Sequence, residues 1–301
     1  MALPKLITVL GPTACGKSGL GVALAARYGG EIVSADSRQV YQGLDLGTGK
    51  ITAEEMEGVP HHLLDILPPG APYSAAQYQA DAYAAIDGIL ARGKLPFLVG
   101  GTGLYLRAVT QGFLFRQVPP NPALRAQLAD KTAAELYTLY RQHTGQTLNE
   151  SERRNRQRLL RAVEKAVAGA ADGEAQTPRY DTLLLGAAYP REILYRRISD
   201  RLEKRLDAGM IDEVAGLRAA GVPDAFLDGL GLEYRSILRY LTGALPDRAA
   251  LVDELGQAIR RFSKRQVSWF SKDDVLWLTM DKNPVEEAVR AIDCFLHGEN
   301  E

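Results

Sequence analysis

The segment that most constrains this chain is a glycine-rich run between an apolar strand and a helix. Residues 11–18 read Gly-Pro-Thr-Ala-Cys-Gly-Lys-Ser, which fits the pattern G-x-x-x-x-G-K-[ST]. The preceding run, Lys5–Leu10, is nearly continuous in apolar residues, as in a strand covered on both faces. After the loop, Leu20, Leu24 and Tyr28 recur at helical spacing. This order predicts an α/β fold built around a phosphate-binding loop.

The chemistry of that loop follows from its residue types. Gly11 and Gly16 allow the backbone to curl, so that successive N–H groups point at phosphate oxygens. Lys17 adds a full positive charge, and the hydroxyl of Ser18 can hold Mg²⁺. A chance glycine-rich turn is the alternative, but the matched strand and helix argue against it. We expect a diphosphate or triphosphate to bind at Gly11, Pro12, Thr13, Ala14, Cys15, Gly16, Lys17 and Ser18, with Cys15 only filling space.

The order of strands and helices predicts a parallel sheet with an insertion. Strand-like runs at 31–35 and 95–99 flank an alanine-rich helix at 74–92. From residue 119 to about 178 the periodicity is helical, and strand character returns at 182–188. We therefore expect a P-loop NTPase-like parallel sheet core, an inserted all-helical domain and a mostly helical C-terminal region. The predicted core comprises 1–118 and 182–301, and the predicted insertion is 119–181.

Two polar positions follow the second and third predicted strands. Asp36 comes directly after one strand, and Thr102 lies in the glycine-rich stretch that follows the other. Ligands of this fold bind outside the carboxyl ends of the strands, so both side chains are expected near the phosphate loop. A carboxylate there can accept a proton or hold Mg²⁺. The alternatives are that Asp36 forms an Asx turn and that Thr102 caps a helix.

Two basic stripes suggest a polyanionic partner that the overall charge does not announce. The chain has 36 basic and 37 acidic residues, for a net charge of −1. One stripe, opposite Leu159, Val163 and Val167, contains Arg154, Arg158, Arg161 and Lys165. The other, opposite Leu255, Ile259, Phe262 and Trp269, contains Arg261, Lys264, Arg265 and Lys272. Such stripes can be merely solvated helix faces, but two of them are typical of phosphate contacts to a nucleic acid.

Several classes of protein are excluded by counts. The two cysteines, Cys15 and Cys294, cannot form a disulfide framework or a zinc site. They favour a reducing, cytoplasmic setting. No run approaches the roughly 18 apolar residues of a membrane helix, so no membrane partner is expected.

Seven motifs in order resemble one family. They are GPTACGKS, SADSRQVYQGLDLGTGK, HHLLDI, LVGGTGLY, QRLLRA, GLEYR and KRQVSWF, between about residues 6 and 270. Together the motifs resemble those of the tRNA dimethylallyltransferases. The resemblance implies transfer of the dimethylallyl group from dimethylallyl diphosphate to N6 of the adenosine 3′ of a tRNA anticodon, adenosine 37. It also implies release of diphosphate and a requirement for Mg²⁺. The C-terminal zinc finger of nuclear and mitochondrial relatives is not seen here, which favours a bacterial cytoplasmic enzyme, expected to be a monomer.

The resemblance also implies roles for particular residues. The phosphate loop, including Lys17, would hold the prenyl diphosphate rather than ATP as a phosphoryl donor, and Arg197 would add charge. Asp36 would be the general base, and Thr102 would lie near the bond that breaks. The helical insertion would clamp the anticodon stem-loop. The implied tRNA contacts are Asp36, Ser37, Arg38, Gln39, Thr102, Gln157, Arg158, Leu159, Leu160, Arg161, Arg235, Lys264, Arg265 and Gln266.

Departures and alternatives remain at this point. The residues before QRLLRA, Glu152–Arg156, and the GLEYR form differ from the usual family sequence, which affects the tRNA contacts and Arg235. A transferase acting on free AMP, ADP or ATP would need the loop and Asp36 but neither basic stripe. A small-molecule kinase would leave KRQVSWF unexplained, and a non-catalytic RNA-binding protein would have no use for Lys17 beside Asp36. His61 and His62 could suggest acid–base work, but a structural or substrate-loop role is expected.

Overall fold

The chain forms two compact units. The structure is a computed structural model and describes residues 2–115, 118–169, 177–271 and 273–298. Unit 1 comprises Met1–Gly112 and Pro178–Glu301, and unit 2 comprises Phe113–Thr177. The chain therefore leaves unit 1 once and returns to it once.

A six-stranded parallel sheet forms the centre of unit 1. Its strands are β1 (Lys5–Leu10), β2 (Glu31–Ala35), β3 (His61–His62), β4 (Pro96–Gly100), β5 (Asp181–Ala188) and β6 (Leu276–Thr279). Their spatial order is β3-β2-β4-β1-β5-β6. The strand before the phosphate loop therefore lies inside the sheet, with Val9 beside Val99 of β4 and Leu185 of β5.

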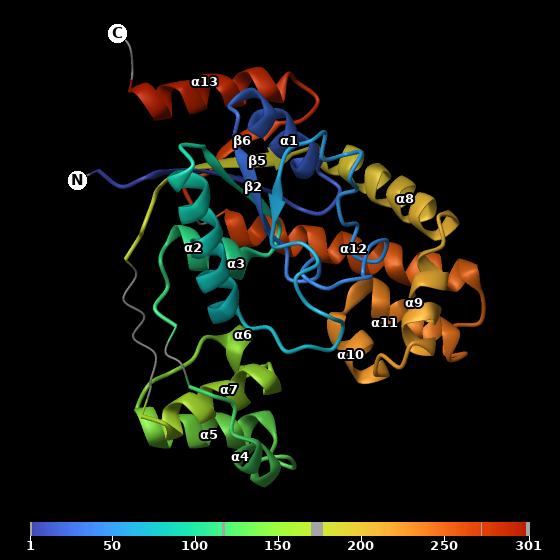
Figure 1. The fold of residues 1–301 in the computed structure, drawn as a ribbon. Coiled ribbons are helices and arrows are strands. Elements are labelled where there is room, and N and C mark those ends of the chain that lie inside the picture. Colours follow the sequence, from blue (N-terminus) through green and yellow to red (C-terminus); the bar gives the residue numbers. More distant parts are fainter. Residues whose placement is uncertain (1, 116–117, 170–176, 272, 299–301) are drawn as a thin grey trace. The chain divides into compact units, whose positions relative to one another are not determined.

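Helices cover both faces of the sheet (Figure 1). Alternate residues of β1 enter different hydrophobic clusters, Ile7 and Val9 into one, Leu6 and Leu10 into the other. The cluster around Val9 includes residues of α1 and α8, and the cluster around Leu6 includes residues of α2 and α3. The helices of unit 1 are α1 (Lys17–Arg27), α2 (Ala75–Ala91), α3 (Gly103–Thr110), α8 (Arg191–Asp207), α9 (Met210–Ala219), α10 (Asp224–Leu230), α11 (Leu232–Leu241), α12 (Arg248–Phe270) and α13 (Pro284–His297).

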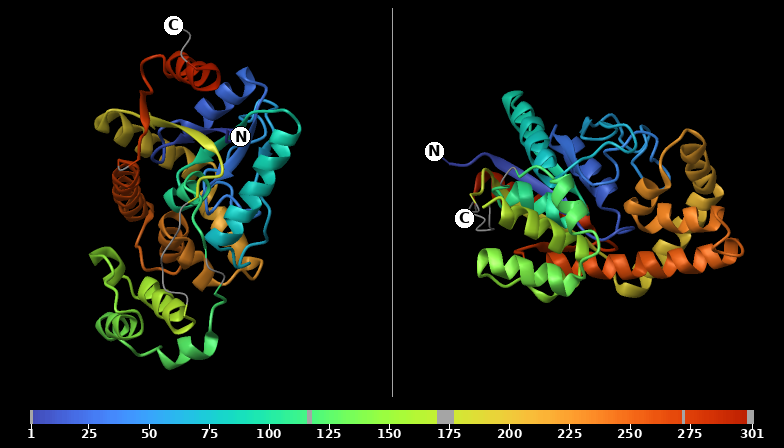
Figure 2. Two further views of the ribbon diagram at one scale, coloured as in Figure 1. Left: turned by 90° about the vertical axis from the view of Figure 1, so that its left-hand side faces the viewer. Right: turned by 90° about the horizontal axis from the view of Figure 1, so that it is seen from below.

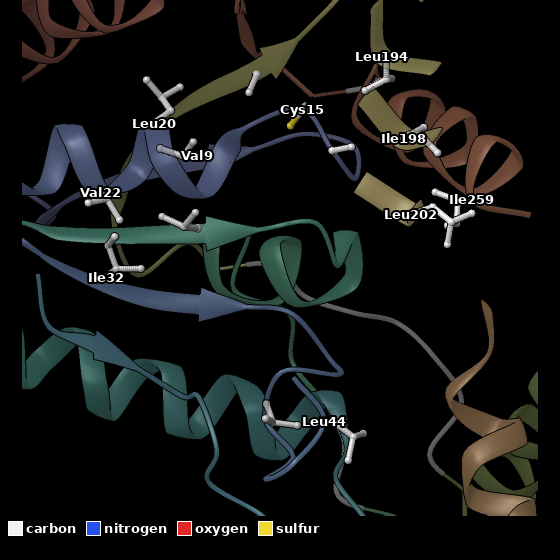
Figure 3. Packing of buried hydrophobic residues seen from close by; sticks show 14 of the residues in the cluster. Val9, Cys15, Leu20, Val22, Ile32, Leu44, Leu194, Ile198, Leu202 and Ile259 are labelled. Carbon is white, nitrogen blue, oxygen red and sulfur yellow. The ribbon is translucent and has the colours of Figure 1, made fainter. Parts of the chain in front are cut away.

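The larger cluster supports the phosphate loop from behind. Leu20 and Val22 of α1 pack with Val9 and Ile32 of the sheet, and Cys15 is fully buried in the same cluster (Figure 3). Each such side chain contributes about 1.5–3 kcal/mol by leaving water. The strand before the loop and the helix after it are therefore held by one apolar core.

A buried carboxylate joins the end of α2 to two strands. Glu31 is 3% exposed. Its oxygens accept hydrogen bonds from Arg92 at 2.6 and 3.3 Å and lie 3.0 Å from Lys94 Nζ. The nearby Arg92 guanidinium is the main cause that lowers the pKa of Glu31 to about 2. His62 Nε2 lies 2.8 Å from the same carboxylate, which is the structural role expected for this histidine.

Unit 2 is a small helical bundle with its own core. It contains α4 (Pro122–Gln127), α5 (Ala133–Thr144), α6 (Glu150–Arg153) and α7 (Arg156–Val167). Leu136 and Tyr140 of α5 pack against Leu159 and Val163 of α7. The buried Glu164 accepts two hydrogen bonds from Arg125, at 2.6 and 2.9 Å, and further ones from Arg161 and the Asn121 backbone.

The α/β class, the parallel sheet and the phosphate-loop strand are as expected, and three details differ. β5 begins at Asp181, inside the expected insertion 119–181, because Asp181 pairs in register with Lys5 and accepts a 2.7 Å hydrogen bond from its Nζ. β6 lies in a region expected to be helical; its run is short and gave no periodic signal. β4 is shifted by one residue from the expected 95–99. Among the described residues, every helix is either too short or too polar to span a lipid bilayer.

Candidate active site

The phosphate loop has the backbone conformation that its sequence predicts. Gly11 has a φ of 154° and Gly16 a φ of 86°, and α1 begins directly afterwards at Lys17. A Cβ on Gly11 would lie 2.6 Å from the carbonyl oxygen of Ala187, so only glycine fits there. Ala14 also has a positive φ, 62°, which is uncommon for a residue with a side chain. Residues around the loop must therefore hold this strained position.

Two cations lie at the loop. Lys17 Nζ donates to the carbonyl oxygen of Pro12 at 3.3 Å, so the ammonium group folds back over the loop. Arg197 of α8 donates from Nε to the carbonyl oxygen of Ala14 at 3.0 Å, and its guanidinium lies 4.7 Å from the Tyr189 ring centroid. The expected contribution of Arg197 thus has a geometric basis. Ser18, also in the first turn of α1, is exposed.

Asp36 and Thr102 lie at the same edge of the sheet. β2 and β4 are neighbours, with Ala35 beside Gly100. Thr102 accepts a hydrogen bond on Oγ1 from the backbone N–H of Ser37 at 3.1 Å, and its own N–H donates to Ala35 at 3.1 Å. Thr102 is the residue before α3, but its side chain does not cap that helix. The hydroxyl instead fixes the turn that carries Asp36.

Asp36 does form the Asx turn that was the alternative for this residue. Its Oδ1 accepts from the backbone N–H of Arg38 at 2.9 Å. Within the described residues, its Oδ2 has no hydrogen-bond partner. The turn therefore orients the carboxylate and leaves one oxygen available to accept a proton.

The remainder of the DSRQ stretch is held just beyond this turn. Gln39 Nε2 donates to the carbonyl oxygen of Gly49 at 3.3 Å. Burial lowers the pKa of the Arg38 guanidinium, and the charge of Asp36 opposes that effect. Ser37 is half-buried and is bound to Thr102 as described above.

Two groups near this turn were missed from the sequence. Tyr105 stacks on Tyr78 with ring centroids 3.8 Å apart, and Tyr78 donates to the carbonyl oxygen of Ser34 at 3.0 Å. These rings form a buried layer beside Asp36, and burial raises the pKa of both phenols. Tyr105 directly follows the LVGGTGL stretch, which was the available signal.

Glu213 of α9 is the other missed group, and it had no sequence signal. Its carboxylate accepts from three consecutive backbone N–H groups, those of Asp45, Leu46 and Gly47, at 3.0, 2.6 and 2.9 Å. It also accepts from the hydroxyl of Tyr234 at 2.8 Å. Glu213 therefore fixes the loop that continues from the DSRQ stretch.

The expected RNA contacts of unit 2 divide into exposed and buried residues. Gln157 and Arg158 are exposed on α7, and Leu160 is half-buried. Leu159 was expected to contact RNA, and this is wrong for its side chain, which is fully buried in the core of unit 2. Arg161 is partly engaged, because it donates to Glu164 and to the carbonyl oxygen of Val118.

The first basic stripe is not one continuous helical face. Asn155 caps α7, so Arg154 lies before that helix and donates instead to Glu150. Val167, expected on the apolar side, is 46% exposed. The stripe within α7 therefore reduces to Arg158, Arg161 and Lys165.

The C-terminal stripe is correct in its basic face, and its expected buried face is correct at Leu255 and Ile259 but wrong at Trp269. Lys264 and Arg265 of α12 are exposed, as expected. The buried face continues from Ile259 through the set Ser263, Gln266 and Phe270, whereas Trp269 is 40% exposed. Gln266 was expected to contact tRNA, but it is 7% exposed and turned inward. Lys272 lies outside the described residues.

Arg235 of α11 is exposed and paired. Its Nε lies 3.0 Å from Asp228 Oδ1, and it also donates to the Asp228 carbonyl oxygen at 2.8 Å. A phosphate that binds this guanidinium would compete with Asp228. Among the described residues, no group of three or more histidine, cysteine or acidic side chains is placed to hold a metal ion by itself.

The sheet order, the loop and the polar edge beside it define a P-loop α/β protein. Comparison with known proteins narrows this class. The family model for IPP transferase matches residues 39–273, and that for isopentenyl transferase matches residues 4–66. The chain belongs to the IPP transferase family, whose members are prenyltransferases.

Individual relatives agree over nearly the full length. The chain is 44% identical over 270 residues to tRNA dimethylallyltransferase 1 of Porphyromonas gingivalis, covering 88% of this chain and 89% of the relative. It is similar to the crystal structure of tRNA isopentenylpyrophosphate transferase from Bacillus halodurans, with a TM-score of 0.73, 35% identity and coverage of 98% and 96%. A eukaryotic dimethylallyltransferase acting on tRNA shares the fold, with a TM-score of 0.82, 23% identity and coverage of 97% and 79%.

Proposed function

We propose that this protein transfers the dimethylallyl group of dimethylallyl diphosphate to N6 of adenosine 37, next to a tRNA anticodon. The reaction gives N6-(dimethylallyl)adenosine and releases diphosphate. The observation that carries the proposal is one sheet edge with two kinds of group. A phosphate loop with Lys17 and Arg197 suits the leaving diphosphate, and Asp36, oriented by its own turn, suits the attacking amine.

The phosphate loop acts on the bond that breaks. The allylic C–O bond ionises more readily when the negative charge on the leaving diphosphate is neutralised. Backbone N–H groups at the start of α1, the ammonium of Lys17 and the guanidinium of Arg197 are the groups at hand. The diphosphate takes the electron pair of that bond as it leaves.

Asp36 acts on the bond that forms. The exocyclic amine of adenine is a weak nucleophile, so removal of its proton helps the attack. N6 forms a bond to the allylic carbon, and its proton passes to the carboxylate. The free Oδ2 of Asp36 is the acceptor, while Oδ1 keeps the Asx turn closed. Thr102 holds the adjacent Ser37 backbone at the same sheet edge, where it would contact substrate.

The phosphate loop suits a magnesium ion that is bound jointly by the protein and the diphosphate. Ser18 offers one exposed hydroxyl in the first turn of α1. Mg²⁺ commonly takes one or two protein ligands and completes its coordination with phosphate oxygens and water. When bound there, it would neutralise further charge on the leaving diphosphate.

The RNA must present an unstacked adenine. An enzyme that modifies a base takes it out of its stack to reach the reacting atom. Arg158 of unit 2, and Lys264 and Arg265 of unit 1, are exposed cations suited to the backbone phosphates of an anticodon stem-loop. We also propose that the protein acts as a monomer in the cytoplasm, where tRNA and an isoprenoid diphosphate are both available.

The test is mass spectrometry of the nucleosides from an unmodified anticodon stem-loop RNA. The RNA is incubated with the protein, Mg²⁺ and dimethylallyl diphosphate, beside a parallel reaction on free AMP. We expect an adenosine heavier by one dimethylallyl group in the RNA alone. Product on AMP alone would indicate a free-nucleotide transferase. Product on neither, with hydrolysis of ATP in a third reaction, would favour a kinase.

A further inference from the structure

Gln266 lies on the buried side of α12, where that helix meets the phosphate loop. α12 is the long orange-red helix in the right-hand view of Figure 2. Its buried residues recur at helical spacing as Ile259, Ser263, Gln266 and Phe270. The first and last are apolar, but the two between them are polar. A buried polar side chain is costly unless its hydrogen bonds are satisfied, so its partners indicate its role.

The amide of Gln266 bridges two backbone segments. Its Oε1 accepts from the N–H of Thr13 at 2.9 Å, and its Nε2 donates to the carbonyl oxygen of Gly101 at 2.9 Å. Thr13 belongs to the phosphate loop, and Gly101 belongs to the turn after β4. Because one partner is a donor and the other an acceptor, they define the orientation of the amide.

The absence of a side chain at Gly101 allows this approach. A Cβ there would lie 2.6 Å from Gln266 Nε2, closer than such contacts occur. It would also lie 3.4 Å from Lys17 Cε. Three motifs of the sequence, GPTACGKS, LVGGTGLY and KRQVSWF, therefore meet at one point beside the phosphate lysine.

The bridge acts on the strained part of the loop. Ala14, with its φ of 62°, directly follows Thr13. Gln266 holds the Thr13 N–H on one side of this residue, and Arg197 holds the Ala14 carbonyl on the other, at 3.0 Å. A strained residue persists only where its neighbours over-determine it. The hydrogen bonds from Gln266 and Arg197 supply this restraint, and they decide where the backbone N–H groups after Ala14 point.

We propose that Gln266 is a positioning residue for the diphosphate site rather than a contact to RNA. It sets the shape of the phosphate loop, while Lys264 and Arg265, two and one positions earlier, remain exposed on the other side of α12. The inference rests on the proposed function, because it assigns the loop to a prenyl diphosphate.

The test compares Gln266→Leu and Gln266→Glu with Gln257→Leu. Gln257 is the matched control, being an exposed glutamine of the same helix that bonds Asp253. Leucine removes both bonds of the bridge, whereas glutamate keeps the acceptor for Thr13. For Gln266→Leu we expect KM for dimethylallyl diphosphate to rise about tenfold or more, and the Kd for the stem-loop RNA to stay within about twofold. Gln266→Glu should lie between, and Gln257→Leu should behave as the wild type.

A second variant and a second measurement distinguish a loss of diphosphate binding from a general folding defect. Gly101→Ala should displace the Gln266 amide and raise the same KM, and the double variant should be no worse than Gln266→Leu alone. Inorganic diphosphate binding by calorimetry measures the loop without turnover. If the wild type binds diphosphate but makes no product, the proposed function fails. If Gln266→Leu binds diphosphate like the wild type but loses tenfold in RNA affinity, Gln266 is an RNA contact and the inference fails.

Discussion

At the scale of single residues, the site depends on side chains whose polar atoms are divided between two tasks. Asp36 uses Oδ1 to hold its own turn, and among the described residues Oδ2 has no hydrogen-bond partner. Thr102 uses its hydroxyl to hold the neighbouring backbone. A turn-forming role and a catalytic role, which were alternatives in the sequence, are therefore compatible in one carboxylate.

Asp36→Asn separates the two roles of this residue. The asparagine oxygen can still accept from Arg38 N–H, so the turn should persist, but the amide is no base. We expect kcat to fall by about 10²–10⁴, with the Kd for stem-loop RNA largely retained. Asp36→Ala should fall at least as far. A normal single-turnover rate with lost RNA binding would contradict the assignment of the base.

Lys17→Ala tests the charge at the phosphate loop. Without the ammonium group, less of the negative charge on the departing diphosphate is neutralised. Hydrogen bonds from a charged donor are among the stronger ones, so the loss should be large. We expect kcat/KM for dimethylallyl diphosphate to drop by about 10- to 100-fold, measured at saturating RNA. Unchanged kinetics would remove the loop from the mechanism.

Residue types predicted the loop well and the buried polar partners poorly. The roles of Gly11 and Gly16 could be predicted because glycine is the residue that readily adopts the positive φ that this loop requires. Gln266 and Glu213 were not, because their roles come from backbone groups 253 and more than 160 positions away in the chain. Leu159 is a different case: its helical spacing placed it opposite the basic stripe, as the structure shows, whereas the motif match that implied an RNA contact does not say which way its side chain points.

At the scale of elements, periodicity located the helices but not always their buried faces. The buried side of α12 has helical spacing, yet it includes two polar residues. Gln266 faces the phosphate loop, and Ser263 donates to the carbonyl oxygen of Arg260 in its own helix. A reading by hydrophobicity chose Phe262 and Trp269 instead. The strand β3 could not be predicted from hydrophobic periodicity, because two residues are too few to show a repeating pattern.

Glu31 makes the junction of β2, β3 and the end of α2 sensitive to pH. Its pKa in the folded protein is about 2, below the usual value of about 4.3, so the unfolded chain takes up the proton first as pH falls. The stabilisation is therefore complete above about pH 5 and is lost as pH falls through 4 towards 2. Glu31→Gln should lower the free energy of unfolding at pH 7 by on the order of 2 kcal/mol. The loss is limited to this size because Arg92 and Lys94 are half-exposed and solvent weakens their attraction to Glu31.

Denaturant melts of Glu31→Gln between pH 2 and pH 7 measure that effect. The variant should also lose part of the acid slope that the wild type shows. Glu286→Gln, which changes an exposed carboxylate of α13, is the control and should leave the slope unchanged. An equal slope in all three proteins would mean that Glu31 is not the titrating group.

At the scale of the whole molecule, net charge and local charge have different meanings. The chain is nearly neutral at −1, yet Lys264, Arg265 and Arg158 leave exposed cations on both units. Neutralising backbone phosphates releases counterions, so RNA affinity should fall steeply with salt. Composition alone could not have revealed this, because acidic residues elsewhere cancel the sum.

Arg158→Glu and Arg265→Glu test the two surfaces separately. Each should weaken stem-loop RNA binding and make the slope of log K against log salt shallower by about one or more units per removed phosphate contact. Arg290→Glu on α13 makes the same charge change at another exposed position and should leave the slope unaltered. Filter-binding titrations between 50 and 200 mM salt would decide. Slopes that match the wild type would mean that these residues are simply exposed to solvent and do not contact RNA.

The distance along the chain between Thr13 and Gln266 has a consequence for synthesis. The two residues that share a 2.9 Å hydrogen bond are 253 positions apart. At translation rates of roughly 5–20 residues per second, the second follows the first by about 10–50 seconds. Until then the nascent chain carries the sequence of a phosphate loop without the partner that completes its shape. A polypeptide released before position 266 would keep the motif and lack its finished geometry.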